Sequence, residues 1–317
     1  MRVIITGCAG FIGFSLARKL LNKKIEVIGI DNLNSYYSRK LKFRRLKILN
    51  EYKNFNFYKK DCSNNNFLSF LKKDRISYIF HFAAEVGVRN SYSKPELYFK
   101  NNIKAFYNIL EFCRIKKSNL IFASSSSVYG LSKSKFFKET DNTSMPISFY
   151  AATKKSNEIM AAAYSKNYKF SAIGIRFFNV YGPWGRPDMS IYKFTEAMIK
   201  NIPLSIYGDG NQIRDFTYID DAITLIQKIM FKQKNILKNK FDIFNSGKGQ
   251  CIKINDLIKL ISKKIEKDPV IRREKKQTGD VFFTNSSSSK IIKILGFKPK
   301  VGLSDGIDHF IKWYLNY

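Results

Sequence analysis

The sequence of 317 residues predicts an α/β fold: a doubly wound parallel sheet followed by a smaller C-terminal α/β domain. Two observations carry this prediction. Short apolar runs alternate with helix-length amphipathic stretches over the first two hundred residues, and a glycine-rich turn follows the first apolar run. Such alternation is typical of parallel strands that are joined by helical crossovers.

The expected elements follow one another in order along the chain. Strands are expected at 3–6, 27–30, 55–58, 78–82, 120–123 and 172–176, with helices between them at 11–22, 67–73, 97–116 and 151–166. After Arg176, loops with Gly and Pro interrupt the alternation, and helices return at 220–232, 255–267, 290–295 and 305–314. This organisation predicts a dinucleotide-binding domain of the Rossmann type over 1–177, joined by a crossing segment at about 215–247, and a substrate domain over 178–317.

The composition favours a globular protein without a membrane segment. Apolar residues make up 44% of the chain, and no apolar run approaches the roughly 18 to 20 residues that span a bilayer. The apolar run at 3–5 is too short for the core of a signal peptide. The four cysteines contain no C-x-x-C pair, which argues against a zinc site and a disulfide framework. We therefore expect a cytoplasmic protein with reduced thiols and no metal.

The formal net charge of +31 raises the question of a nucleic-acid partner. The basic residues are spread over nearly every segment, and 43 of the 56 are lysine, which recognises bases and phosphates less well than arginine. The densest cluster, at 39–47, has apolar residues at helical spacing and is interpreted as one solvated face of an amphipathic helix. Neither a specific nucleic acid nor a membrane is expected as a partner.

The stretch TGCAGFIG places Gly7, Gly10 and Gly13 directly after the first expected strand and at the start of a helix. Glycines allow a tight turn there and let the backbone approach a pyrophosphate on the helix N-terminus. Asp31 ends the second expected strand, where a carboxylate accepts hydrogen bonds from the adenosine ribose and disfavours a 2′-phosphate. The cofactor is therefore predicted to be NAD, with contacts from Gly7, Gly10, Phe11, Ile12, Gly13, Asp31 and Asn32. Asp61 and Cys62 follow the third strand and are interpreted equally as adenine contacts or as a turn.

Tyr150 and Lys154 lie four residues apart on an expected helix, and therefore on one face of it. A free phenol has a pKa near ~10, and a nearby cation favours its ionised form. Y-x-x-x-K is common by chance, but here it lies downstream of a dinucleotide loop and twenty-five residues after Ser125. That serine belongs to the run ASSSSVYG at the end of an expected strand, which by itself fits either a ligand site or a plain turn.

With these motifs the chain resembles the extended short-chain dehydrogenase/reductase family, the nucleotide-sugar epimerases and dehydratases, over essentially its whole length. The resemblance implies that Ser125, three residues before V-Y-G, bonds the sugar 4-hydroxyl, and that Tyr150 and Lys154 complete the catalytic set. Dehydratases and decarboxylases of the family carry acids at the next two positions, where this chain has Ser126 and Ser127. The resemblance therefore implies simple epimerisation.

Four further stretches resemble the UDP-glucuronate 4-epimerases more closely than the UDP-glucose 4-epimerases: HFAAEVGVRNSYSKP, YAATKKSNEIMAAAYS, RFFNVYGPWGRPDMSIYKF and RDFTYIDDA. The resemblance implies NAD-dependent conversion of UDP-glucuronate to UDP-galacturonate through a 4-keto intermediate. It implies cofactor contacts from Ala83, Ala84, Asn101, Tyr150, Lys154 and Phe178. It implies substrate contacts from Arg89, Ser125, Ser126, Ser127, Asn179, Arg186, Arg214, Gln277 and Asp280.

Arg186 is interpreted as the partner of the sugar carboxylate, because a guanidinium offers a planar fork that matches it. A solvent-facing loop arginine is the alternative. His81 is interpreted as a structural hydrogen-bonding residue, and Ile159 and Met160 as core. The resemblance also implies a homodimer built on a four-helix bundle and a role in polysaccharide biosynthesis.

Other functions stay open. The chain could be a 4-epimerase of UDP-glucose or UDP-N-acetylglucosamine. A nucleotide-sugar dehydratase or decarboxylase, or a non-catalytic NAD-binding protein, is a more remote alternative.

Overall fold

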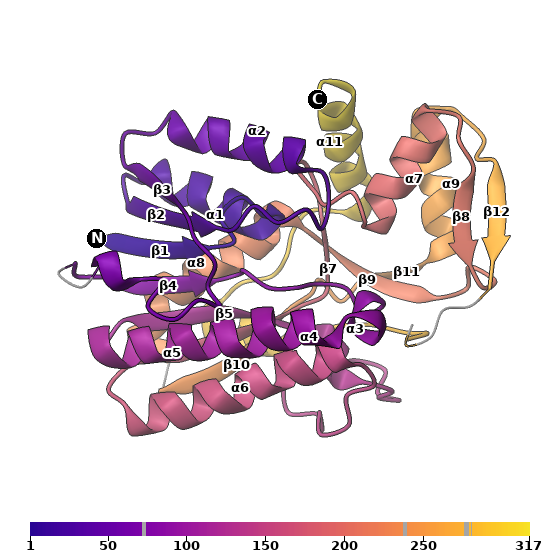
Figure 1. Cartoon of the computed structure of the whole chain (residues 1–317). Helices are drawn as coiled ribbons and strands as arrows, with labels where there is room; N and C mark the ends of the chain where they lie inside the picture. The colour runs from indigo at the N-terminus through magenta and orange to yellow at the C-terminus, as the bar shows by residue number, and fades with distance from the viewer. Residues whose placement is uncertain (72–73, 237–239, 276–278, 280) are drawn as a thin grey trace. The chain divides into compact units, whose positions relative to one another are not determined.

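The computed structural model describes residues 1–71, 74–236, 240–275, 279 and 281–317, and it divides into two compact units (Figure 1). Unit 1 consists of Met1–Gly130, Asn142–Arg176 and Ile226–Phe244. Unit 2 consists of Leu131–Asp141, Phe177–Leu225 and Asn245–Tyr317. The chain therefore passes from one unit to the other several times.

Unit 1 is built on a seven-stranded sheet in the order β10-β6-β5-β4-β1-β2-β3. From β3 to β5 the neighbouring strands pair in parallel. Successive strands are added outward from β1 on one side and from β4 on the other, so the predicted doubly wound sheet is confirmed. The strands are β1 (Arg2–Thr6), β2 (Glu26–Asp31), β3 (Phe55–Lys59), β4 (Tyr78–His81), β5 (Asn119–Ser125), β6 (Ala172–Phe177) and β10 (Phe241–Ser246).

Helices cover both faces of this sheet. In Figure 1, α1 and α2 lie along one face, and α5 and α6 lie along the other. Apolar side chains fill the layer under α5 and α6, where Phe106, Leu120 and Phe122 are fully buried. The α-helices of unit 1 are α1 (Phe11–Leu21), α2 (Arg39–Asn50), α3 (Asn90–Ser93), α4 (Pro95–Tyr98), α5 (Ala105–Lys116) and α6 (Phe149–Asn167). Helix α8 (Ile219–Ile236) begins in unit 2 and ends in unit 1.

Short non-α helices mark three places where the expected elements are modified. The prediction of a helix over 67–73 is wrong in length, because the described residues of this segment form a single 3₁₀ turn, η1 (Ser69–Leu71). The helix expected at 97–116 contains a π-helical turn, η2 (Phe99–Lys104), between α4 and α5. A further 3₁₀ turn, η3 (Ser126–Tyr129), follows β5 directly.

Among its described residues, unit 2 contains two small sheets and four complete helices. One sheet has the order β11-β9-β7, with β7 and β9 parallel and β11 antiparallel to β9; the other pairs β8 with β12 in parallel. The strands are β7 (Asn179–Tyr181), β8 (Leu204–Tyr207), β9 (Ile213–Tyr218), β11 (Cys251–Lys253) and β12 (Ile271–Glu274). The helices are α7 (Ser190–Ile199), α9 (Ile254–Ile265), α10 (Ser289–Leu295) and α11 (Leu303–Leu315).

The burial of the strands explains why the central sheet forms. In β1 every residue after Arg2 is buried, which is typical of a parallel strand with helices on both faces. The carboxyl ends of β1 and β4 lie at the point where the strand order reverses, and ligands bind at this point in open α/β sheets. Over the described residues, no helix combines the length and the apolar character that crossing a bilayer requires.

Candidate active site

The glycine loop joins β1 to α1 with a geometry that side chains would obstruct. Gly7 has φ +72°, and its N–H donates to Ile30 O at 2.7 Å. A Cβ on Gly7 would lie 2.7 Å from the backbone N of Ala83, and one on Gly13 would lie 2.2 Å from Gly7 O. The structure therefore brings the predicted loop and the predicted Ala83 into contact.

The N-terminus of α1 suits an anionic ligand. Its N-cap is Gly10, and no described side chain caps this end of the helix. The first helical bond at this end runs from Phe14 N to Gly10 O at 3.0 Å, so the N–H groups of Phe11, Ile12 and Gly13 precede it and have no partner within the helix. These residues fit the pyrophosphate of a dinucleotide.

Asp31 lies at the end of β2, beside the glycine loop. Its carboxylate accepts hydrogen bonds from Ala9 N at 3.2 Å and Leu33 N at 2.8 Å. The Nζ of Lys42 on α2 lies 3.6 Å from Asp31 Oδ1. Burial lowers the pKa of Lys42, and the charge of Asp31 counteracts this effect.

The interpretation of 39–47 as a solvated basic face is wrong for two of its residues. Lys42 is 5% exposed and Arg45 is 0% exposed. Arg45 donates to Ala9 O at 2.8 Å and to the hydroxyl of Tyr37 at 2.6 Å, and Lys42 donates to Asn34 at 2.8 Å. Sequence reasoning missed these residues, although Lys42, Arg45 and Leu49 share the spacing of one buried helix face.

Asn32 and Asp61 lie side by side at the ends of β2 and β3. Asn32 Nδ2 donates to Asp61 Oδ2 at 3.4 Å. Asp61 also accepts from the N–H and the hydroxyl of Ser63, at 2.8 and 2.7 Å. The adjacent Cys62 is buried, and burial raises the pKa of its thiol. This turn fits both interpretations of the Asp61-Cys62 pair.

The loop after β4 is held by two neighbouring asparagines of the π-helical turn η2. Asn101 Nδ2 donates to the Glu85 carboxylate at 3.2 Å. Asn102 Oδ1 accepts from Glu85 N at 2.7 Å, and its Nδ2 donates to Glu85 O and to the hydroxyl of Thr153 on α6. Asn102 thus joins the loop that carries Ala83 and Ala84 to the helix that carries Tyr150. Of these two residues, only Asn101 was predicted as a site residue. The position of Asn102 directly beside it in the sequence is a signal that could have indicated Asn102 as well.

Tyr150 and Lys154 lie on the first turns of α6. Ser148 starts this helix, with its hydroxyl accepting from Ala151 N at 3.1 Å. The Lys154 Nζ lies 5.9 Å from the centroid of the Tyr150 ring and donates to Ala123 O on β5 at 3.0 Å. Burial lowers the pKa of Lys154 to about 8, so its ammonium remains mostly protonated at neutral pH. The arrangement places a cation beside the phenol, as the sequence predicted.

His81, at the end of β4, is buried beside Thr6. Its Nδ1 shares a hydrogen bond with the Thr6 hydroxyl at 2.8 Å. Burial and, to a smaller extent, the charge of Lys154 lower the pKa of His81 to about 3. The imidazole is therefore neutral throughout the physiological range, and its interpretation as a structural hydrogen-bonding residue agrees with this position.

The serine run divides its residues between different tasks. Ser125 ends β5 and caps η3, since its Oγ accepts from Ser127 N at 3.2 Å. The Ser125 and Ser127 hydroxyls lie 3.1 Å apart. Ser124, which sequence reasoning passed over, donates instead to the Glu158 carboxylate of α6 at 2.6 Å.

In unit 2, the predicted residues Phe178, Asn179 and Arg214 lie on or next to β7 and β9. Phe178 is buried, and its N–H donates to Ser246 O at 3.2 Å. Asn179 begins β7 and pairs with Phe216 of β9, two residues beyond Arg214. Arg214 Nη1 donates to the carbonyl oxygen of Phe282 at 3.1 Å.

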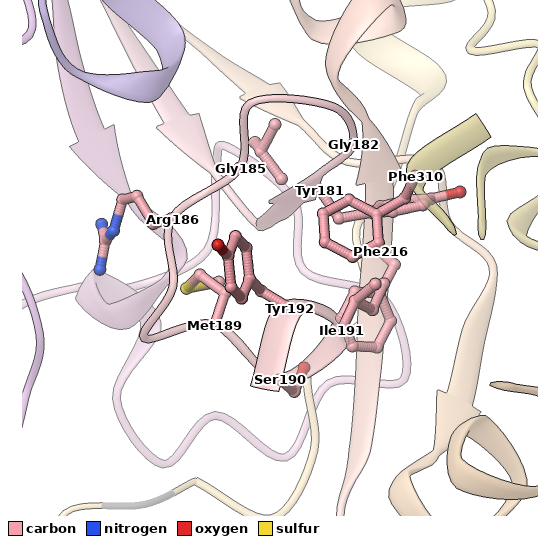
Figure 2. Close-up of a pocket in the computed structure, with 11 residues that line it drawn as sticks. Tyr181, Gly182, Gly185, Arg186, Met189, Ser190, Ile191, Tyr192, Phe216 and Phe310 are labelled. Carbon is pink, nitrogen blue, oxygen red and sulfur yellow. The ribbon is translucent and has the colours of Figure 1, made fainter. Parts of the chain in front are cut away.

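Arg186 lies in the loop between β7 and α7, at the edge of an apolar pocket. Aromatic side chains line this pocket, and Figure 2 shows Arg186 directed away from Tyr192 and Phe310. Its guanidinium contacts the Asp188 carboxylate at two points, with Nε donating to Oδ1 at 3.0 Å and Nη2 to Oδ2. The fork predicted for a ligand carboxylate therefore holds a carboxylate of the same loop.

Three of the predicted substrate residues are less informative. Gln277 and Asp280 lie outside the described residues. Arg89 is exposed at the N-terminus of α3, where its carbonyl oxygen accepts from Tyr92 N at 3.1 Å. Among the described residues, no group of three or more His, Cys, Asp or Glu side chains is arranged to hold a metal ion.

Comparisons with known proteins agree with this geometry. The family model described as GDP-mannose 4,6 dehydratase matches residues 4–310. Protein CapI of Staphylococcus aureus is 40% identical over 100% of this chain and 99% of that protein, and a probable UDP-glucuronate 4-epimerase of Rhizobium meliloti is 36% identical over 99% and 97%. The crystal structure of UDP-glucuronic acid 4-epimerase from Bacillus cereus, in complex with UDP-glucuronic acid and NAD, is 34% identical with a TM-score of 0.93 and full coverage of both chains. The chain therefore belongs to the extended short-chain dehydrogenase/reductase family, in the group of nucleotide-sugar enzymes that the GDP-mannose 4,6 dehydratase model describes.

Proposed function

We propose that this protein inverts C4 of UDP-glucuronate to give UDP-galacturonate, with NAD as its resident cofactor. The observation that carries the proposal is the set of Ser125, Tyr150 and Lys154, which β5 and α6 hold in a single unit. The full-length similarity to an epimerase crystallised with UDP-glucuronic acid and NAD supports the choice of substrate and cofactor.

The residues around the glycine loop fit NAD. The N-terminus of α1 would hold the pyrophosphate, and Asp31 would hold the adenosine ribose. The chemistry that bound NAD supplies is removal of hydride from C4 and its return to the opposite face of the sugar, so the cycle is redox-neutral. A cofactor that is regenerated in every cycle is expected to stay bound.

The side chains of unit 1 handle the proton. Tyr150, as phenolate, takes the proton of the 4-hydroxyl when C4 is oxidised and returns it when C4 is reduced. Lys154 favours the phenolate, since its ammonium lies 5.9 Å from the ring centroid and stays charged at neutral pH. Ser125 orients the hydroxyl by hydrogen bonding.

The sugar carboxylate adds a requirement that neutral sugars lack. The 4-keto form of glucuronate is a β-keto acid, which loses CO₂ once the carboxylate bond aligns with the carbonyl π system. We propose that Arg186 holds the carboxylate out of this alignment by a two-point contact. Ser126 and Ser127 offer hydroxyls where related dehydratases and decarboxylases carry acids, so no acid assists a side reaction there.

Unit 1 is proposed to bind NAD, and unit 2 to contribute Asn179, Arg186 and Arg214 to binding of the nucleotide sugar.

We also propose a cytoplasmic homodimer that serves polysaccharide biosynthesis. Exposed apolar side chains on α5 and α6 support the dimer, since Ile115 is 66% exposed, Tyr107 is 47% exposed and Ile159 is 60% exposed. The prediction that Ile159 belongs to the core of the chain is therefore wrong. Sedimentation equilibrium would test the dimer, and a monomer at micromolar concentration would contradict it.

A substrate panel tests the proposed reaction. The purified protein is incubated separately with UDP-glucuronate, UDP-glucose and UDP-N-acetylglucosamine, and the epimers are resolved by chromatography. We expect UDP-galacturonate from the first and at least tenfold slower conversion of the other two. Preference for a neutral sugar would favour the alternative 4-epimerase functions, and a dehydrated or decarboxylated product would overturn simple epimerisation.

A further inference from the structure

A buried ion pair joins α6, the helix that carries Tyr150 and Lys154, to strand β6. It takes no part in the chemistry described above. Glu158 of α6 and Arg176 of β6 are each 3% exposed. Arg176 Nε donates to Glu158 Oε1 at 2.8 Å, and Nη2 donates to Oε2 at 2.9 Å. The Ser124 hydroxyl donates to Oε1 at 2.6 Å, and Lys155 Nζ lies 3.4 Å from Oε2.

The pair joins the elements that carry the candidate catalytic residues. Glu158 follows Lys154 by one helical turn and therefore lies on the same face of α6. On β5, Ala123 accepts from Lys154 and Ser124 donates to Glu158, so two successive strand residues are fixed to two successive turns of the helix. The next residue along the strand is Ser125.

The guanidinium extends the network to the turn after β5. Arg176 lies 4.8 Å above the centroid of the Tyr129 ring, at the end of η3. The turn that holds Ser126 and Ser127 is thereby packed against the same cation. Helix α6, strand β5 and turn η3 all meet at one buried carboxylate and its partner.

Stability alone gives little reason for such a pair. Burying two charges has a desolvation cost that often cancels their attraction, and apolar residues of similar volume commonly stabilise a fold as well or better. A two-point ion pair does fix distance and orientation more tightly than apolar packing. Proton transfer is sensitive to small displacements of the groups that perform it.

We propose that Glu158, held by Arg176 and Ser124, is a positioning residue that sets Lys154 and Tyr150 against Ser125. The inference rests on the proposed function, because it concerns the same proton transfer. Glu158 does not contact the reacting atoms in this assignment. It fixes the register between the helix that carries the base and the strand end that carries the hydroxyl.

The test replaces the pair without leaving a buried charge. In the double variant Glu158→Leu/Arg176→Met the two side chains remain bulky and apolar, so folding is expected to survive. The matched control is Glu111→Gln on α5. Glu111 accepts from the Tyr164 hydroxyl at 2.9 Å and thus holds α6 six residues, or somewhat less than two turns, beyond Glu158, near the C-terminal end of the helix.

Two readouts separate positioning from a purely structural role. We expect kcat of the double variant to fall about tenfold to a hundredfold while KM changes less than threefold. We also expect the acid limb of its pH–kcat profile to move upward, because a displaced Lys154 favours the phenolate less. Among the described residues, the titratable groups that face Tyr150 and Lys154 include Tyr98 of α4 and His81 of β4, and His81 stays neutral over the assayed range of pH 6–9.

The outcomes decide the proposal whether or not the double variant folds. A folded double variant with the kcat and pH profile of the wild type, or an equal loss in Glu111→Gln, would overturn it. If the double variant does not fold, Ser124→Ala removes a single hydrogen bond from the network, and an unchanged kcat and profile there would overturn it instead. Wild-type protein that fails to epimerise any UDP-sugar contradicts the proposed function, whereas active wild type with unaffected variants contradicts only the role of Glu158.

Discussion

Two arginine–carboxylate pairs, one in each unit, make the same two-point contact in opposite surroundings. Arg176 and Glu158 lie on different elements of unit 1, and both are 3% exposed. Arg186 and Asp188 lie two residues apart in one loop of unit 2, with side chains 22% and 28% exposed. The first pair ties a helix to a strand, and the second closes a short loop on itself.

The difference shows which contacts are suited to exchange. Removing one member of a buried pair leaves an uncompensated charge and is strongly destabilising. A partly exposed pair contributes little to stability, because water solvates either partner when the contact opens. The Arg186–Asp188 contact is therefore suited to the exchange that the proposed function requires, in which Arg186 leaves Asp188 for the sugar carboxylate, while Arg176 is suited to a permanent contact. The four predictions that follow test this contrast between a fixed unit 1 and an adaptable loop in unit 2.

The largest effect is expected at Tyr150. Tyr150→Phe removes the proposed base but leaves the ring, so turnover should fall by about 10²- to 10⁴-fold while NAD binding persists. The control is Tyr98→Phe, because the ring of Tyr98 lies 6.1 Å from that of Tyr150 and its hydroxyl donates to the carbonyl oxygens of Val86 and Gly87. Steady-state kinetics and NAD titration measure both variants. Near-native turnover of Tyr150→Phe would contradict the assignment of the base.

Arg186→Ala should have the next largest effect. Loss of a charge-assisted contact of about 1.5–3 kcal/mol predicts a decrease of kcat/KM for UDP-glucuronate of roughly tenfold to a hundredfold. Binding of UDP alone should change far less, and some UDP-pentose product is expected by mass spectrometry. Asp188→Asn is the control, with an expected change below about threefold. Equal losses in the two variants would indicate that the pair is a fixed structural contact and that Arg186 is not exchanged to a ligand.

Substitutions in the serine run of unit 1 are expected to have a smaller effect on turnover than the two changes above. Ser125→Ala should reduce kcat by about tenfold, because the hydroxyl that orients the sugar is lost. Ser126→Ala and Ser127→Ala should each have a weaker effect on kcat. Equal losses in all three variants would show that the register of this strand end has been assigned incorrectly.

The smallest effect concerns stability and pH. His81 has a pKa of about 3 in the folded protein, whereas a histidine in an unfolded chain titrates near ~6.5. Between pH 6.5 and pH 3 the unfolded state therefore takes up a proton that the folded state does not. The contribution of His81 to the free energy of unfolding is lost as the pH falls through this range. In His81→Asn, which keeps an acceptor for Thr6 but cannot titrate, the slope of unfolding free energy against pH should decrease by up to about 1.4 kcal/mol per unit. Urea unfolding at several pH values measures it, and parallel slopes would argue against a buried neutral imidazole.

The sequence predicted the framework of unit 1 well because local rules govern it. Continuous apolar runs indicated the buried parallel strands, and the glycines after β1 indicated a turn that the positive φ of Gly7 requires. Helical spacing predicted that Tyr150 and Lys154 share one face of α6, and their place downstream of the glycine loop and Ser125 distinguished them from a chance Y-x-x-x-K pattern. The residues that were missed depend on tertiary contacts.

Three of the missed residues share one physical feature. Lys42, Arg45 and Glu158 are charged, and charged residues are usually assigned to the surface. Their burial becomes acceptable only through partners far away in the sequence, such as Ala9 for Arg45 and Arg176 for Glu158. In unit 2 the sequence predicted that the guanidinium of Arg186 would hold a carboxylate. It could not predict the pairing with Asp188, because that contact depends on the path of a loop, which no hydrophobic periodicity describes.

The π-helical turn Phe99–Lys104 has a consequence for the length of the chain. A π turn amounts to one extra residue within an α-helix, and here it contains both Asn101 and Asn102, which contact opposite ends of Glu85. Deleting one residue from this turn would restore regular α-helical geometry and keep the register between α4 and α5, but it would turn Asn101 or Asn102 away from Glu85 by about 100°. The loss of a single residue should therefore leave the helix continuous and yet release the loop that carries Ala83 and Ala84, because the contacts of the two asparagines with Glu85 would be lost.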